Sequence, residues 1–304
     1  MQAISFRPDV SHALQCGRPV VALESTIIAQ GLPRPDNLDV ARKVEQTVRA
    51  AGAVPATIGM LAGRLVVGLD DDELTQLATT DGVAKLSVRD LAPAAAAGVD
   101  GATTVAATSA VAHRAGIALF ATGGLGGVHR DASVSFDESA DLVALGTTPV
   151  TVVCAGVKSI LDVGATLERL ETLGVPVVGY GTHRFPGFYL TDGGYDLDWS
   201  VNSPDEVAMI LRTRARQRVS SAALVVANPL PEHEQLDPAL HDRVLAEGLA
   251  DLAAKGITGK AVTPYLLAHF HAATGGRSLE VNVRIILRNA ELAARIAVAA
   301  AGRP

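Results

Sequence analysis

The chain has 304 residues, of which 48% are hydrophobic and only 4% aromatic. This length and composition suit one sizeable α/β domain, which we expect to span residues 1–304, and they argue against an all-β module. The formal net charge of −6 argues against binding to nucleic-acid polymers, because such a role needs a basic face to neutralise phosphates.

Short apolar runs rich in β-branched residues alternate along the chain with segments of helical period. The expected strands are residues 20–23, 65–69, 117–121, 150–154, 175–180 and 223–227. The expected helices include residues 37–51, 159–173 and 204–217, then a helical region from residue 237 onward whose last helix covers about 281–300. This alternation predicts a single-domain α/β/α sandwich with a largely parallel central sheet, for which a mixed sheet is also allowed.

Residues 185–199 have a different character from these regular segments. They contain Pro186 and two adjacent glycines, Gly193 and Gly194, so we expect a long irregular stretch. An extended loop in a compact domain is often a lid or an oligomer contact, and an ordinary surface loop is an equal alternative.

The termini and the cysteines bear on where the protein works. The first nine residues lack the apolar run of a secretory signal. The most apolar stretch, residues 103–123, is interrupted by a histidine and an arginine, so we expect no membrane span. Cys16 and Cys154 form neither a metal-binding spacing nor a dense disulfide framework, which favours a reducing compartment. We therefore expect a cytoplasmic protein.

Polar residues or glycines follow several of the expected strands, at the edge where open α/β sheets assemble their sites. Glu24 comes directly after residues 20–23, where a carboxylate can act as a general acid or base, or can merely cap a helix or pair with a basic side chain. The glycine-rich segment 123–127 follows residues 117–121. Its backbone N–H groups could approach an anion such as phosphate, although a structural turn has the same composition.

Two further segments carry charged residues that could do chemistry. Asp137 and Asp141 would share one face if their segment is helical, which suits Mg or Mn, although a solvated acidic helix end is the more frequent outcome. Lys158 follows residues 150–154 and is expected at a helix start. The positive helix end and the apolar neighbours would disfavour its ammonium form, as a nucleophilic lysine requires, while a lysine that binds phosphate or solvent is the alternative.

Lys85 ends another apolar segment, as a phosphate partner would, or it is a surface lysine whose stem lies along apolar surface. The histidines show no metal-ligand pattern, and no order of Cys, His and Asp suggests a hydrolase triad.

Taken together, several motifs resemble the pseudouridine-5'-phosphate glycosidase (indigoidine-synthase-A-like) family. The motifs are ALESTII (22–28), GAVPATI (52–58), TTVAAT (103–108), ATGGLGGVH (121–129), CAGVKSILD (154–162), GYGT (179–182), ANP (227–229) and VTPYLL (262–267). They extend over nearly the whole chain, and a joint match of this kind is highly specific.

The resemblance implies roles for individual residues. It implies a Schiff-base-type nucleophile at Lys158, a proton donor at Glu24 and a manganese site, also open to magnesium, at Asp137. The implied substrate-binding positions are Lys85, Thr104, Val105, Thr122, His129, Ser139, Ala140, Asp141 and Asn282, of which Asn282 would face the base. The family is typically homotrimeric.

The implied reaction is the reversible cleavage of pseudouridine 5'-phosphate to uracil and ribose 5-phosphate. The scheme with two carboxylates cannot apply, because a C-glycosidic bond has no leaving oxygen or nitrogen to protonate at the anomeric carbon. Three alternatives stay open: synthesis of C-nucleosides in the reverse direction, a phosphosugar lyase or aldolase that uses Lys158, and a non-catalytic nucleotide-binding module.

Overall fold

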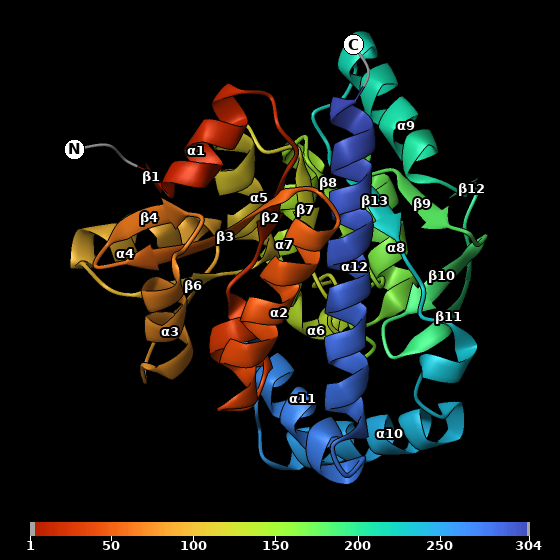
Figure 1. The fold of residues 1–304 in the computed structure, drawn as a ribbon. Coiled ribbons are helices and arrows are strands. Elements are labelled where there is room, and N and C mark those ends of the chain that lie inside the picture. Colours follow the sequence, from red (N-terminus) through yellow and green to blue (C-terminus); the bar gives the residue numbers. More distant parts are fainter. Residues whose placement is uncertain (1–3, 303–304) are drawn as a thin grey trace.

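A central mixed sheet of eleven strands runs through the molecule, and helices cover its faces (Figure 1). The structure is a computed structural model that describes residues 4–302. The sheet comprises β1 (Ile4–Phe6), β2 (Val20–Leu23), β3 (Val54–Leu61), β4 (Arg64–Val67), β5 (Ala84–Leu86), β6 (Gly101–Thr103), β7 (Leu119–Ala121), β8 (Thr151–Cys154), β9 (Val177–Tyr180), β12 (Trp199–Val201) and β13 (Leu224–Ala227).

The strand order is β1-β4-β3-β2-β7-β8-β13-β9-β12, with β6 paired to β3 and β5 paired to β6. Every neighbouring pair from β3 across to β12 is parallel. Antiparallel pairing occurs where β3 meets β4 and β6. The predicted α/β/α sandwich with a largely parallel sheet is therefore confirmed, and its sheet is mixed.

Helices pack on both faces of the sheet, so its central strands are buried on both sides. The helices are α1 (Pro8–Gln15), α2 (Asp36–Ala50), α3 (Asp71–Thr79), α4 (Leu91–Ala97), α5 (Val105–Arg114), α6 (Ala132–Ser135), α7 (Ala140–Thr147), α8 (Val163–Thr172), α9 (Pro204–Gln217), α10 (Pro238–Ala254), α11 (Val262–Ala273) and α12 (Arg277–Ala301). In β2, Val20 and Ala22 belong to the core that includes α5 and α7, whereas Val21 and Leu23 belong to the core that includes α2 and α12. This alternation is the two-residue period of a strand.

The longest helix, α12, crosses one face of the sheet, and Figure 1 shows it in blue running almost the height of the molecule. It packs against α2 and α9 and lies over β2, β7 and β8. It begins at Arg277, four residues before the expected start, directly after Gly276, whose φ is +87°. No helix in residues 4–302 is long and apolar enough to cross a lipid bilayer.

The strand predictions were correct in place but incomplete. Residues 20–23 match β2, and the other five predicted runs each overlap one observed strand. The predictions omitted β3, because Pro55 and Gly59 interrupt its pattern and both residue types are unfavourable inside strands. Gly59 packs closely there, since a Cβ at this position would lie 2.8 Å from a Leu77 methyl group, which would have to shift.

The expectation of an irregular stretch over residues 185–199 was wrong. Strands β10 (Arg184–Gly187) and β11 (Leu190–Asp196) form an antiparallel hairpin, and β12 then joins the main sheet. Phe188 turns the chain with a φ of +62°, and Phe185 and Tyr189 are buried in the core. The hydrophobic contacts of these aromatic side chains outweigh the loop tendency of the proline and glycines nearby.

Candidate active site

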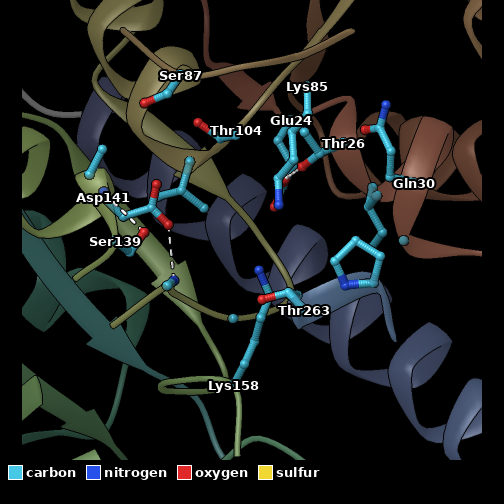
Figure 2. Close-up of a pocket in the computed structure, with 18 of the residues that line it drawn as sticks. Glu24, Thr26, Gln30, Lys85, Ser87, Thr104, Ser139, Asp141, Lys158 and Thr263 are labelled. Atoms are coloured by element: carbon cyan, nitrogen blue, oxygen red, sulfur yellow. Dashed lines mark hydrogen bonds between the residues drawn. The ribbon is translucent and has the colours of Figure 1, made fainter. Parts of the chain in front are cut away.

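A cavity of about 340 Å³ opens at the edge where the carboxyl ends of β2, β7 and β8 meet. Eleven of the twelve predicted site residues line it, namely Glu24, Lys85, Thr104, Val105, His129, Asp137, Ser139, Ala140, Asp141, Lys158 and Asn282. The residues come from strands and helices spread over most of the chain. Figure 2 shows Lys158 on the side of the pocket opposite Glu24 and Lys85.

Glu24 follows β2 and is held from two sides by hydroxyl groups. Its side chain is nearly buried, with 6% of the residue exposed. Thr26 donates a hydrogen bond to Oε2, and Thr122 donates one to Oε1. Because a threonine hydroxyl can donate or accept, both contacts can persist whether or not Glu24 carries a proton. The carboxyl group is therefore fixed in orientation.

Thr122 differs from the other predicted residues because it does not line the pocket. It is fully buried, and its hydroxyl group is used by Glu24. The expectation that Thr122 contacts the sugar phosphate is therefore not supported by its position. Its contact is with the carboxyl group that faces the cavity.

The glycine-rich loop after β7 is tied into the protein by its own amide groups. Leu125 N donates to the Gly156 carbonyl at 2.9 Å, Gly126 N to Asp141 Oδ2 at 2.9 Å, and Val128 N to Thr166 Oγ1 at 2.9 Å. These N–H groups cannot also hold an anion. In the segment 123–127 these bonds engage the N–H groups of Leu125 and Gly126, so an anion would have to use those of the remaining glycines, of which Gly123 and Gly124 line the cavity.

Glycine is needed in this loop because other side chains approach its backbone closely. A Cβ on Gly126 would lie 2.2 Å from Ser139 Oγ, and one on Gly127 would lie 2.3 Å from Thr166 Oγ1. Both separations are shorter than van der Waals contact. The loop therefore brings Ser139 and Asp141 of the α7 start against the pocket wall.

Lys158 lies in an extended segment, so its expected place at a helix start was wrong. The segment pairs with the glycine-rich loop, since Val157 bridges Leu125 and Lys158 N donates to the Leu125 carbonyl at 3.1 Å. The helix α8 begins only at Val163, where the Asp162 side chain accepts a hydrogen bond from Ala165 N at 2.9 Å. Asp162 is the N-cap, so the helix end does not act on Lys158 directly.

Two residues near the Lys158 segment, Arg130 and Cys154, bear on its role. Arg130 restrains the backbone, and Cys154 is the other side chain that could be considered as a nucleophile. Arg130 donates to the carbonyl oxygens of Ser159 at 3.1 Å and Ile160 at 3.3 Å, which fixes the chain after the lysine. Burial raises the pKa of the Cys154 thiol to about 12, so this group stays protonated at neutral pH. The thiol is also fully buried and does not line the cavity, which argues against a cysteine nucleophile at the end of β8.

Asp141 is buried and serves as a structural anchor. Its Oδ1 atom accepts from Ala106 N at 2.9 Å, and its Oδ2 atom accepts from Gly126 N at 2.9 Å. The carboxylate therefore joins the first turn of α5 to the glycine-rich loop. It lies at the pocket wall with both oxygens already engaged.

Asp137 and Asp141 do not share a helical face, so that expectation was wrong. Helix α7 starts at Ala140 with Ser139 as its N-cap, and Asp137 precedes it. The Asp137 side chain is 37% exposed, and its Oδ2 atom lies 3.9 Å from His129 Nε2. The part of the chain that the structure describes contains no group of three or more His, Cys, Asp or Glu side chains arranged to hold a metal ion.

Several pocket residues were not singled out from the sequence. Ser87 and Arg89 follow β5, Phe188 comes from the turn of the β10–β11 hairpin, and Thr263 and Leu267 come from α11. Only the motif 262–267 gave a signal for α11. The others lie in segments whose contribution depends on how distant parts of the chain fold together.

A carboxyl group and a lysine lie on opposite sides of one cavity, at the carboxyl ends of parallel strands, and form the candidate active site of an α/β enzyme. A model of the indigoidine synthase A like protein family matches residues 9–299. The chain therefore belongs to this family of enzymes.

Similar proteins carry more specific names. The chain is 75% identical to a pseudouridine-5'-phosphate glycosidase of Salinispora tropica, over 97% of this chain and 91% of that protein. It is 61% identical to a protein of the same name from Streptomyces griseus, over 96% and 91%. Among solved structures it is similar to the prealnumycin C-glycosynthase AlnA in complex with ribulose 5-phosphate, with a TM-score of 0.91, 37% identity and coverage of 99% and 98%.

Proposed function

We propose that this enzyme cleaves the C-glycosidic bond of pseudouridine 5'-phosphate and releases uracil and ribose 5-phosphate. The observation that carries the proposal is the pair of Glu24 and Lys158 on opposite sides of one cavity. The names of relatives that are 75% and 61% identical support the choice of substrate. The pair also argues against a non-catalytic nucleotide-binding module, which would need no nucleophile.

The reaction has to open the ribose ring before the carbon–carbon bond can break. In our scheme Glu24 protonates the ring oxygen while electrons from the uracil ring assist the opening of the C1'–O4' bond. The amine of Lys158 then adds to C1'. The nitrogen lone pair subsequently expels uracil as C5 of the base takes up a proton, which leaves an imine between Lys158 and C1'.

Hydrolysis of this imine completes the cycle. Water adds to C1', the carbon–nitrogen bond breaks, and ribose 5-phosphate leaves with the free lysine restored. Glu24, as the carboxylate left after the ring opens, is placed at the same cavity and can take back a proton. The net reaction consumes one water molecule.

A direct test measures the release of uracil. Purified protein is incubated with pseudouridine 5'-phosphate and Mn²⁺, and the products are measured by ultraviolet absorbance and mass spectrometry. Release of uracil with an equal amount of ribose 5-phosphate supports the proposal. Consumption of open-chain phosphosugars without any reaction of the nucleotide would instead point to a lyase or aldolase.

We propose that the substrate phosphate binds on the side of the pocket formed by β5 and the start of α5. Lys85 supplies a cation, and Ser87 and Thr104 supply hydroxyl groups on the same side in Figure 2. The glycine-rich loop lines the same cavity, and among residues 123–127 only Leu125 and Gly126 have their N–H groups engaged, so the loop can contribute further donors.

Unphosphorylated pseudouridine should therefore be a poor substrate. Loss of the charge-assisted contacts to phosphate should cost on the order of 3 kcal/mol of transition-state binding, or about a hundredfold in kcat/KM. The measurement compares kcat/KM for nucleoside and nucleotide. In Lys85→Ala the nucleotide should lose most of its advantage, and equal values for both substrates in the unmodified enzyme would contradict this phosphate site.

We also propose a divalent cation, Mn²⁺ or Mg²⁺, beside Asp137. One partly exposed carboxylate at a polar cavity fits a hard cation that keeps most of its waters. Such an ion would supply positive charge that neutralises the substrate phosphate. Asp137 would hold it, and His129 would help to orient the carboxylate.

Removal of the cation should lower turnover. Exhaustive treatment with EDTA should depress kcat/KM for the nucleotide, and added Mn²⁺ should restore it. Asp137→Asn should weaken the restoration, because a neutral amide attracts a hard cation less strongly. Full activity after EDTA treatment would remove the metal from the scheme.

The reverse direction, in which a sugar phosphate is joined to a base, is the second candidate. It is favoured by the similarity to a C-glycosynthase that is 37% identical. The much higher identity to the glycosidases favours cleavage. We further propose that the enzyme forms a homotrimer, on the basis of the family resemblance. We also propose that it works in the cytoplasm, because both of its cysteines are free.

A further inference from the structure

Asn289 on α12 is a polar side chain in the core whose whole amide group is engaged. Only 1% of it is exposed. Its Nδ2 atom donates to the carbonyl oxygens of Thr122 at 2.8 Å and Gly123 at 3.2 Å, and its Oδ1 atom accepts from Asn228 Nδ2 at 2.9 Å. A buried amide is costly unless it is hydrogen-bonded, so this residue is tied to the backbone it contacts.

Asn289 holds the backbone of Thr122, and the side chain of Thr122 in turn holds Glu24. Thr122 N donates to the Val153 carbonyl at 3.0 Å, and the Thr122 hydroxyl group donates to Glu24 Oε1. Asn228, which follows β13, donates its backbone N–H to the Cys154 carbonyl at 2.8 Å. A continuous chain of hydrogen bonds thus runs from the ends of β13 and β8 through α12 to the end of β7 and to Glu24.

The same helix also contributes directly to the pocket. Asn282 lies seven residues before Asn289, two helical turns away on the same side of α12, and it lines the cavity. Helix α12 therefore places the Asn282 amide at the pocket and also holds the backbone of Thr122, whose side chain contacts Glu24. A shift of α12 would alter both.

We infer that Asn289 is a positioning residue for Glu24 and that it acts through Thr122. The inference rests on the proposed function, in which Glu24 gives a proton to the ribose ring oxygen. Proton transfer needs the acid within hydrogen-bond reach of that oxygen, so loss of the constraint on Thr122 should slow ring opening. The steps at Lys158 do not need this proton once the sugar is in its open form.

Two assays on Asn289→Ala separate positioning from a general structural effect. Cleavage of pseudouridine 5'-phosphate should fall about three- to tenfold in kcat, the range expected for one lost hydrogen bond between neutral groups, with KM little changed. Borohydride trapping of ribose 5-phosphate on Lys158 should stay near the unmodified level, because that sugar opens unaided. A purely structural defect would lower both readouts together.

Asn37→Ala is the matched control. Asn37 is also 1% exposed, and its Nδ2 atom donates to the carbonyl oxygens of Ile28 at 2.8 Å and Ala78 at 2.9 Å, neither of which belongs to the path through Thr122. This variant loses a comparable amide but should keep the ratio of cleavage to trapping. A fall of that ratio in Asn37→Ala as large as in Asn289→Ala would overturn the inference.

Thr122→Val keeps the side-chain shape and tests the same path if Asn289→Ala does not fold. It should show the same loss of cleavage with retained trapping, and the double variant should be little worse than the more affected single one. Wild-type kcat in a folded Asn289→Ala or Thr122→Val, or fully additive losses, would overturn the inference. Absence of both cleavage and trapping in the unmodified enzyme would instead reject the proposed function itself.

Discussion

Lys158→Ala should abolish turnover of pseudouridine 5'-phosphate and should also abolish the covalent sugar adduct. Borohydride added to the unmodified enzyme with ribose 5-phosphate should reduce the imine and fix a pentose-phosphate mass on the peptide that contains Lys158. The variant should fold normally, because the lysine side chain lines a cavity and its truncation removes no core volume. Mass spectrometry of the digested protein detects the adduct, and circular dichroism shows whether the variant is folded.

Lys85→Ala is the control for this experiment, since Lys85 lines the same pocket as a second lysine. Its adduct should still form on Lys158, although a higher sugar concentration should be needed if Lys85 binds the phosphate. A label on Lys85 in the unmodified enzyme, or near-normal turnover in Lys158→Ala, would show that the nucleophile has been assigned wrongly.

Glu24→Gln should separate ring opening from the later steps. Loss of the proton donor should reduce turnover on the order of 10²- to 10⁴-fold, the usual contribution of general acid catalysis. Trapping of ribose 5-phosphate on Lys158 should persist. Folding should be preserved, because the hydroxyl groups of Thr26 and Thr122 can donate to the amide oxygen and accept from the amide nitrogen.

The two variants form a diagnostic pair. Lys158→Ala should lose cleavage and trapping, whereas Glu24→Gln should lose cleavage alone. If Glu24→Gln cleaves the nucleotide at close to the unmodified rate, the ring is opened by another group and the role of Glu24 has to be abandoned.

Much of the sheet could be predicted because its central strands are short, apolar and bounded by clear breaks. Val20–Leu23 is buried over its whole length, so a continuous apolar run marked it without ambiguity. The carboxyl ends of such parallel strands meet at one edge. Polar residues that follow them, such as Glu24 and Lys158, can therefore be expected together from the sequence alone.

Local geometry could not be predicted where contacts across the chain decide it. Asp162, not Lys158, begins the helix after β8, because residues 156–162 first pair with the glycine-rich loop. The Asp141 carboxylate is engaged by two amide groups, from Ala106 and Gly126, that are distant from each other in the sequence. Spacing alone cannot distinguish such an anchor from a ligand.

The role of Asn289 on α12 was the largest omission for the site. Its apolar pattern predicted a helix, but not that Asn289 would reach the backbone of Thr122 and Gly123. A buried asparagine within an apolar helix is the available signal, since it must find partners in the core. The identity of those partners depends on how the helix crosses the sheet.

The docking of α12 completes the wall of the cavity. The helix supplies Asn282 to the cavity and packs over β2, β7 and β8, which carry Glu24 and the segments next to Lys158. Strands made early by the ribosome can pair before this helix emerges, but the cavity has no complete wall until then. A chain that stops before α12 should therefore contain Lys158 without a complete pocket around it.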